Sequence, residues 1–182
     1  MIHKGLVSRY AIVALFLASL MHSPLFAATP DSTALAAFHA SACSVAGWTE
    51  GKDRFRSFGT KELFQLIDGG AVEYEKPGLI GGVTFDLSGP DKKLAEFFIE
   101  DFGTPIKAKS MVKQKRKSAS EPKGLSGTKA GDAFTDEVIG GCVAYGYFKG
   151  FYFELSLTGY DSAVLAALDA KMFLRTLTTN SR

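Results

Sequence analysis

The late segment Cys142–Leu157, CVAYGYFKGFYFELSL, constrains the fold more than any other part of the chain. It consists of two β-prone runs around a short turn that contains Lys149 and Gly150, a pattern that predicts an antiparallel hairpin. Successive side chains of a strand point to opposite faces, so the second run places its apolar residues on one face. These residues are Phe151, Phe153, Leu155 and Leu157. We therefore expect a hairpin with one buried face.

Helical and strand patterns alternate along the rest of the chain. We expect helices over Asp31–Ala42 and Asp91–Phe102, a half-buried strand over Leu79–Gly89, and a final helix capped by Asp161. The final helix would pack through four apolar residues at helical spacing: Val164, Leu165, Leu168 and Met172. Strands adjacent in the sequence, with helices between them, predict an α+β fold. The expected architecture is one antiparallel sheet with helices packed mainly on one face.

The N-terminal segment has the composition of a secretory signal peptide. Lys4 and Arg9 precede the apolar run Tyr10–Leu20, and a small-residue exit follows it. The run is shorter than the roughly 20 apolar residues that a membrane-spanning helix needs, although an uncleaved anchor helix is the alternative. We expect residues 1–27 to be removed and residues 28–182 to form a single domain. The protein would then be periplasmic or secreted, with no stable membrane span.

Removal of the signal peptide changes the charge balance. Lys4 and Arg9 are lost, so 21 − 2 = 19 basic residues face 19 acidic ones. A net charge of zero gives no support for nucleic-acid binding. His39 is then the only imidazole, and no motif identifies a serine partner for a hydrolytic triad. The sequence also lacks a Cys-x-x-Cys pair, a Walker loop and a dinucleotide fingerprint, so we expect no cofactor.

Two cysteines, Cys43 and Cys142, remain after export. In an oxidising compartment such a pair most simply forms a disulfide, and two buried free thiols are the alternative. A metal site is a further alternative, since His39 and Cys43 are four residues apart on a predicted helix and Cys142 could supply a third ligand. The disulfide is the simpler interpretation, and we expect no metal.

The segment Leu63–Gly78, LFQLIDGGAVEYEKPG, keeps a helical apolar stripe across two adjacent glycines. The helix either ends at Asp68 or continues to about Glu75. Continuation costs about 1 kcal/mol for each glycine relative to alanine, but the unbroken phase of the stripe favours it. Gly69 and Gly70 would then have a structural role, because they let the helix lie close to a neighbouring backbone.

The same segment carries the candidate catalytic residues Asp68, Glu73 and Glu75. On a continuous helix Asp68 and Glu75 share a face, with Glu73 elsewhere, and seven residues span roughly 10 Å. That separation is wide for two groups acting on one bond. General acid–base catalysis requires burial that raises one pKa; the alternative is that Asp68 faces water or satisfies backbone groups. Tyr74 lies on the core stripe and is a candidate binding residue.

The motif LFxxIDGGAxxY, which ends at Tyr74, resembles the signature of an exported bacterial family known as domain of unknown function 6599. The turn at Ser88–Asp91 and the aromatic strand at Gly150–Phe153 occupy comparable places in that family. Val72 departs from the pattern, since an acid is expected there. The resemblance covers about residues 45–175 and implies export and an α+β domain. It transfers no catalytic residues, because the family has no known activity.

A basic cluster begins near residue 107. The stretch Lys107–Gly124 holds seven basic residues and one acid. We expect a mobile basic loop over about residues 107–131, with an edge strand near Ser110–Gln114 whose lysines discourage sheet pairing. The cluster is a candidate site for an anionic partner, and a merely solvated loop is the alternative. Its candidate binding residues are Lys113, Lys115, Arg116 and Lys117.

These patterns favour a non-catalytic binding or interaction module of the bacterial cell envelope. Its partner would be an anionic envelope component or another protein. The basis is negative, because catalytic constellations are missing while packing signals are abundant. The alternative is a small carboxylate-dependent hydrolase acting on an envelope polymer, using Asp68 with Glu73 or Glu75.

Overall fold

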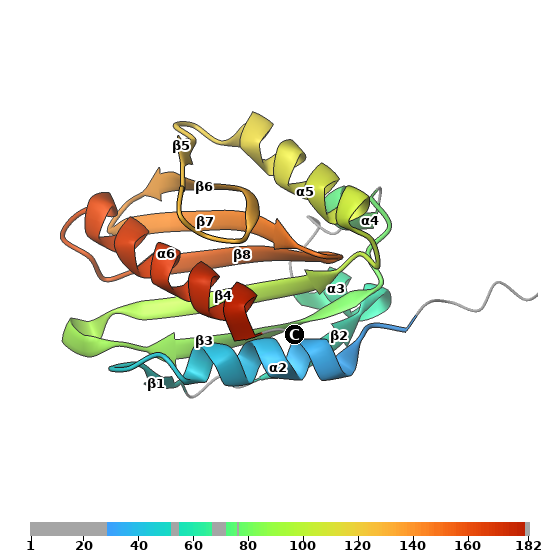
Figure 1. Ribbon diagram of the computed structural model, residues 1–182, viewed down its shortest axis with the longest axis horizontal. Helices are drawn as coiled ribbons and strands as arrows, with labels where there is room; N and C mark the ends of the chain where they lie inside the picture. The colour runs from blue at the N-terminus through green and yellow to red at the C-terminus, as the bar shows by residue number, and fades with distance from the viewer. Residues whose placement is uncertain (1–28, 52–54, 67–71, 76, 181–182) are drawn as a thin grey trace, which may run out of the picture.

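An eight-stranded antiparallel sheet runs through the computed structural model, which describes residues 29–51, 55–66, 72–75 and 77–180 (Figure 1). The strand order is β1-β3-β4-β8-β7-β6-β5, and β2 also pairs with β3. The strands are β1 (Thr49–Glu50), β2 (Arg56–Gly59), β3 (Gly81–Ser88), β4 (Leu94–Asp101), β5 (Lys123–Gly124), β6 (Gly131–Val138), β7 (Gly141–Phe148) and β8 (Phe151–Thr158). The helices are α2 (Ser32–Cys43), α3 (Thr60–Leu66), α4 (Val72–Glu75), α5 (Pro105–Ser118) and α6 (Ala163–Asn180).

The predicted α+β fold and the predicted hairpin are confirmed. β7 and β8 pair from Phe148 and Phe151 outward, which leaves Lys149 and Gly150 as the connecting loop. Lys149 has φ 54°, the left-handed conformation that tight hairpin turns require. The predicted apolar face of β8 is buried along its length.

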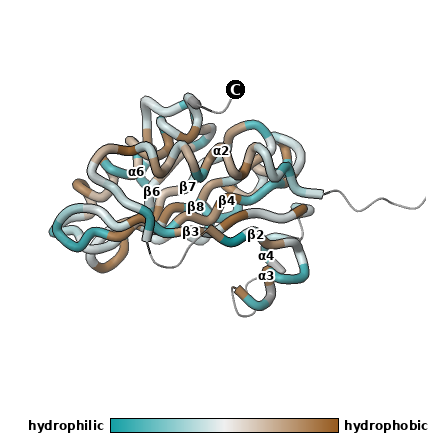
Figure 2. Tube along the Cα trace, turned by 90° about the horizontal axis from the view of Figure 1, so that it is seen from below, coloured by the Kyte–Doolittle hydropathy of each residue, from teal (hydrophilic) through white to brown (hydrophobic). Residues whose placement is uncertain are grey.

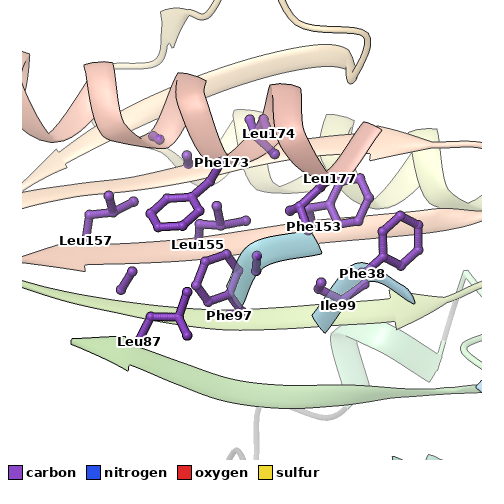
Figure 3. Packing of buried hydrophobic residues seen from close by; sticks show 14 of the residues in the cluster. Phe38, Leu87, Phe97, Ile99, Phe153, Leu155, Leu157, Phe173, Leu174 and Leu177 are labelled. Atoms are coloured by element: carbon purple, nitrogen blue, oxygen red, sulfur yellow. The ribbon is translucent and has the colours of Figure 1, made fainter. Parts of the chain in front are cut away.

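Helices α2 and α6 cover one face of the sheet, and their apolar side chains form the larger core cluster (Figure 3). Phe97 on β4 stacks on Phe85 of β3 with ring centroids 4.6 Å apart, and it meets Phe173 of α6 edge-on at 5.0 Å. Phe38 of α2 contacts Phe153 of β8 edge-on. Aromatic pairs in these geometries add to the stabilisation from burial alone.

The opposite face of the sheet is covered by α5 (Figure 1) together with α3 and α4 (Figure 2), so the helices lie on both faces rather than mainly on one, as was predicted. A second core cluster forms there, with Ala108, Met111 and Val112 of α5 fully buried against the sheet. Two apolar layers therefore enclose the middle of the sheet. The start of α2 is linked to the end of β4, because the Asp31 backbone N–H donates to Asp101 Oδ2 at 2.9 Å.

The helix predicted over Asp91–Phe102 is wrong, since residues Leu94–Asp101 form β4 in the centre of the sheet. Leu94, Phe97, Phe98 and Ile99 fit the spacing of a helical stripe, and a short apolar segment of this kind is ambiguous between a helix and a strand. The strand predicted over Leu79–Gly89 is confirmed as β3, and the first predicted helix is confirmed as α2 with Asp31 as its cap.

The edge strand predicted near Ser110–Gln114 is wrong, and so is the first part of the mobile loop predicted over about residues 107–131, because Pro105–Ser118 form helix α5. Thr104 caps the helix by accepting from the Lys107 N–H, and Pro105 occupies its first turn. The high density of charged residues suggested a loop, although the spacing of the apolar residues favours a helix. Ala108, Met111 and Val112 recur at helical spacing between the lysines.

The final helix is confirmed, but its predicted packing face is wrong. Val164, Leu165 and Leu168 are exposed. The helix instead buries Ala166, Ala170, Phe173, Leu174 and Leu177. Ser162, rather than Asp161, accepts from a backbone N–H of the first turn. The small residues Ala166 and Ala170 let α6 lie close to the sheet, a preference that hydrophobicity alone does not reveal.

The predicted disulfide is wrong: Cys43 and Cys142 are both free. Cys43 lies at the end of α2 with its Sγ 3.4 Å from His39 Nε2. Cys142 is buried in β7 beside Ala163 and Val164 of α6. The two sulfurs therefore occupy different environments rather than one bridge.

Three predictions fall outside the described residues. These are the signal peptide at residues 1–27, the candidate Asp68, and the close packing of Gly69 and Gly70. The described residues on either side of this gap form α3, which ends at Leu66, and α4, which begins at Val72. Within the described ranges, no helix combines the length and the hydrophobicity that crossing a membrane requires.

The corrected face of α6 is testable with two identical substitutions on one helix. Leu174 is 0 % exposed and Leu168 is 59 % exposed. Leu174→Ala should lower the free energy of unfolding by about 2–5 kcal/mol, because it removes buried methyl groups and leaves a cavity. Leu168→Ala should lower it by less than about 1 kcal/mol. Urea denaturation of both variants measures the difference, and equal losses would contradict the assigned face.

Candidate functional site

Ionisable side chains gather beneath α5, on the sheet face opposite to α2 and α6. We call Tyr74, Glu100, Lys115, Tyr152 and Glu154 the acid–tyrosine cluster. The register between β4 and β8 pairs Glu100 with Tyr152 and Phe98 with Glu154. Glu100 and Glu154 are therefore diagonal neighbours on the same face, within reach of each other's field. α4 and α5 add Tyr74 and Lys115 from above.

Glu154 is the acceptor at the centre of the cluster. Its Oε2 accepts from the Tyr152 hydroxyl at 2.8 Å and from the Tyr74 hydroxyl at 3.4 Å. Lys115 Nζ lies 3.7 Å from the same oxygen and 3.4 Å from Glu73 Oε2. The Lys115 ammonium also lies 4.8 Å from the centre of the Tyr74 ring, a cation–π arrangement. Lys115 thus contacts the carboxylates of Glu154 and Glu73 and the ring of Tyr74.

Glu100 is the most unusual member of the cluster. It is 0 % exposed, and neither carboxyl oxygen has a hydrogen-bond partner within the described residues. Burial raises its pKa well above the usual value, and the nearby Glu154 carboxylate raises it further, while Lys115 acts in the opposite direction. Burial and Glu154 also raise the pKa values of Tyr74 and Tyr152. The environment therefore favours the protonated form of Glu100.

The cluster contains groups that could transfer protons, but the protein itself occupies them. Glu100 and Tyr152 are fully buried, so a substrate has no direct access to either side chain. The Glu154 carboxylate is already bound by two hydroxyls and an ammonium. A general acid must come within hydrogen-bond reach of its substrate. The arrangement is that of a buried polar core in which Glu154 is fully engaged and Glu100 is shielded from solvent, with Lys115 on its outer side.

The structure brings together only some of the residues singled out from the sequence. Tyr74 and Lys115 are in contact, as are Lys115 and Glu73. Glu73 is exposed and forms a surface ion pair. Asp68 and the side chain of Glu75 lie outside the described residues. The three predicted acids therefore form no catalytic group that the structure describes.

The remaining basic candidates divide between two roles. The Arg116 guanidinium lies 4.5 Å from the centre of the Phe134 ring and donates to the Asp132 carbonyl, so it packs against β6. Lys113 and Lys117 are exposed on α5. Neither forms an ion pair with any residue that the structure describes.

Sequence reasoning missed Glu100. The acid follows three apolar residues, Phe97, Phe98 and Ile99, in LAEFFIED, a segment whose apolar spacing predicts a helix. Interpreted as a strand, it alternates Ala95, Phe97 and Ile99 on one face with Glu96, Phe98 and Glu100 on the other. That alternation was the available signal, but the proximity of Glu154 depends on strand pairing.

A shallow groove lies beside the cluster on β3 and β4, with a volume of about 420 Å³. Its polar lining includes Arg56, Thr84, Asp86 and Glu96, and Phe98 separates it from the acid–tyrosine cluster. Opposite charges line the same groove, so it presents no single sign of charge to a ligand.

Comparisons with known proteins leave the family open. No model of a known protein family and no curated protein matches the chain. Among solved structures, the chain is similar to the extracellular domain of PknH from Mycobacterium tuberculosis. The two are 14 % identical with a TM-score of 0.42, and the match covers 81 % of this chain and 92 % of that chain. The resemblance to domain of unknown function 6599 stays a prediction.

The raised pKa of Glu100 predicts a pH dependence of stability. The proton is held more tightly in the folded state than in the unfolded state, where the pKa is about 4.3. Glu100 therefore costs stability progressively as pH rises above that value, until the folded carboxyl also ionises. In Glu100→Gln this loss should disappear, because the amide does not titrate.

Urea denaturation of wild type and Glu100→Gln across a pH series measures this effect. The free energy of unfolding of wild type should fall relative to that of the variant as pH rises. Glu96→Gln, an exposed position on the same strand, should run parallel to wild type. Parallel curves for Glu100→Gln would show that this carboxyl is not held protonated.

Proposed function

We propose that the protein is an exported, non-catalytic module of the bacterial cell envelope that binds phosphate groups of an envelope surface through the outer face of α5. The observation that carries this proposal is the charge of α5. The helix PIKAKSMVKQKRKS has six basic residues and no acidic residue. Export itself is supported by the N-terminal pattern of the sequence and by its family resemblance.

Three of the six cations are engaged by the protein. Lys115 is bound in the acid–tyrosine cluster, Arg116 packs on Phe134, and Lys109 Nζ lies 3.3 Å from Asp132 Oδ2. The other three, Lys107, Lys113 and Lys117, are exposed. Lys113 and Lys117 are one helical turn apart, which places their side chains on the same side of α5. They are available to a ligand.

Helix stability does not account for all of this charge. Cations in the last turn interact favourably with the helix dipole, which explains Lys115, Arg116 and Lys117. Lys107 lies in the first turn, where a cation is unfavourable, and Lys113 lies outside both end turns. A concentration of charge that the fold does not require is expected at a surface that attracts anions.

The buried side of α5 fixes these cations in space. Ala108, Met111 and Val112 are 0 % exposed and hold the helix on the sheet. Ordering a flexible segment reduces affinity, so cations on a rigid helix bind an anionic surface at lower entropic cost. The acids beneath α5 support binding rather than catalysis, because Glu154 is engaged by Lys115 and two tyrosines and Glu100 is fully buried.

Vesicle binding tests the proposal. The full chain should bind vesicles that contain phosphatidylglycerol and should not bind vesicles of phosphatidylcholine alone. Each lysine near an anionic surface contributes about 1 kcal/mol. Lys113→Gln with Lys117→Gln should therefore weaken binding by about 30-fold. Binding should also weaken as ionic strength rises. Co-sedimentation measures both effects.

The matched control is Lys61→Gln with Lys129→Gln, which removes the same charge from two exposed positions outside α5. This control should bind the vesicles like wild type. If it loses as much affinity as the variant of Lys113 and Lys117, binding depends on net charge alone and the proposal is overturned. A parallel titration with polyphosphate distinguishes a phosphate-bearing polymer from a lipid surface. Binding to polyglutamate but to neither phosphate probe would identify an acidic protein as the partner and overturn the assignment.

A further inference from the structure

Three potential metal ligands converge where α2 passes the edge of the sheet. His39 and Cys43 lie one turn apart on α2, and Glu50 reaches them from β1. His39 Nε2 is 3.4 Å from Cys43 Sγ and 3.1 Å from Glu50 Oε1, and all three ligand atoms lie within 4.8 Å of one another. We propose that His39, Cys43 and Glu50 bind a divalent transition-metal ion of the Zn²⁺ class.

Packing holds the imidazole in place. The His39 ring contacts Phe55 and Phe85, with its centroid 4.7 Å from that of each ring, and its side chain is 20 % exposed. β1 positions Glu50 through its pairing with β3, which sets Glu50 opposite Leu87. The nitrogen thus has a fixed direction, whereas the Glu50 side chain, 52 % exposed, is free to rotate toward it.

His39 Nε2 is shared by two neighbours, Glu50 Oε1 and Cys43 Sγ. A neutral imidazole carries one N–H, so Nε2 either donates to Glu50 or accepts from the Cys43 thiol. The first arrangement leaves the thiol without its acceptor. The second places the lone pair of nitrogen against the carboxylate. A cation between the three atoms interacts favourably with nitrogen, sulfur and oxygen together, and none then competes with another.

The ligand set selects the class of ion. Thiolate and imidazole favour borderline and soft metals, whereas Mg²⁺ and Ca²⁺ take oxygen ligands. Zinc bonds of about 2.0–2.3 Å at tetrahedral angles place ligand atoms about 3.3–3.7 Å apart. The distances from Nε2, 3.1 and 3.4 Å, are close to this range. Rotation of Glu50 closes the remaining gap between sulfur and oxygen. Three protein ligands leave a fourth position for water or a further ligand.

This site is independent of the proposed function. It lies beside the core cluster covered by α2 and α6, whereas the basic helix α5 packs on the opposite face of the sheet. Cys142, which the sequence suggested as the third ligand, is buried in β7. Glu50 takes that role instead, and the absence of a disulfide leaves the Cys43 thiol available.

Titration of the reduced full chain with Co²⁺ tests the proposal, because a cobalt–thiolate bond gives a charge-transfer absorption band that other ligands do not. One equivalent should bind, and Zn²⁺ should displace it. Cys43→Ser should abolish the band. Glu50→Gln should weaken Co²⁺ binding by at least tenfold. Glu50 is largely exposed, so this variant should retain its fold, and circular dichroism checks that it does.

Two controls make the result decisive. Glu121→Gln, an exposed carboxylate outside the site, should bind Co²⁺ like wild type. Cys142→Ala should retain the thiolate band, because this sulfur is not a ligand. The proposal is overturned if no thiolate band develops. It is also overturned if Glu50→Gln binds as tightly as wild type, or if the band depends on Cys142.

Discussion

The fold depends on two neighbouring strands at the centre of the sheet, β4 and β8, which bury one face along its length and part of the other. On the second face Glu100 and Tyr152 are fully buried although Glu96 is exposed, so the sheet needs a covering layer on each side. Phe97 shows the constraint on one side, where it is held between Phe85 and Phe173. Tyr152 shows it on the other side, where it is fully buried beneath α5. Helices on one face alone would leave half of this pair exposed.

The two covering layers have different chemistry. The α2–α6 side is packed mainly with aliphatic and aromatic residues (Figure 3). The α5 side contains the acid–tyrosine cluster, where burial raises the pKa of Glu100 and Lys115 compensates the charge of Glu154. A buried charge is tolerated when it is paired and hydrogen-bonded. The cluster thus explains one cation of α5 as a structural requirement, which sets apart the exposed lysines that serve the proposed binding surface.

The proposed metal site and the proposed anion surface share no residue and lie on opposite layers. The first depends on three ligand atoms within 4.8 Å of one another, and the second depends on exposed charge along one helix. Their chemistry differs accordingly: a transition-metal ion needs close, directional contacts, whereas an anionic surface needs only positive potential. An experiment that contradicts one of these two proposals therefore leaves the other unaffected.

The sequence by itself determined the elements whose faces differ in polarity. The hairpin, β3, α2 and the existence of α6 were predicted because one buried and one solvated face leave a period of two or 3.6 residues. Where burial was two-sided or charge was dense, the pattern misled, as in β4 and α5. The tertiary structure alone decided which side of α6 is buried, and it alone brought Glu100 to Glu154 and Glu50 to His39. Those contacts join residues far apart in the sequence, and no local periodicity encodes strand pairing or the packing of a helix against a sheet.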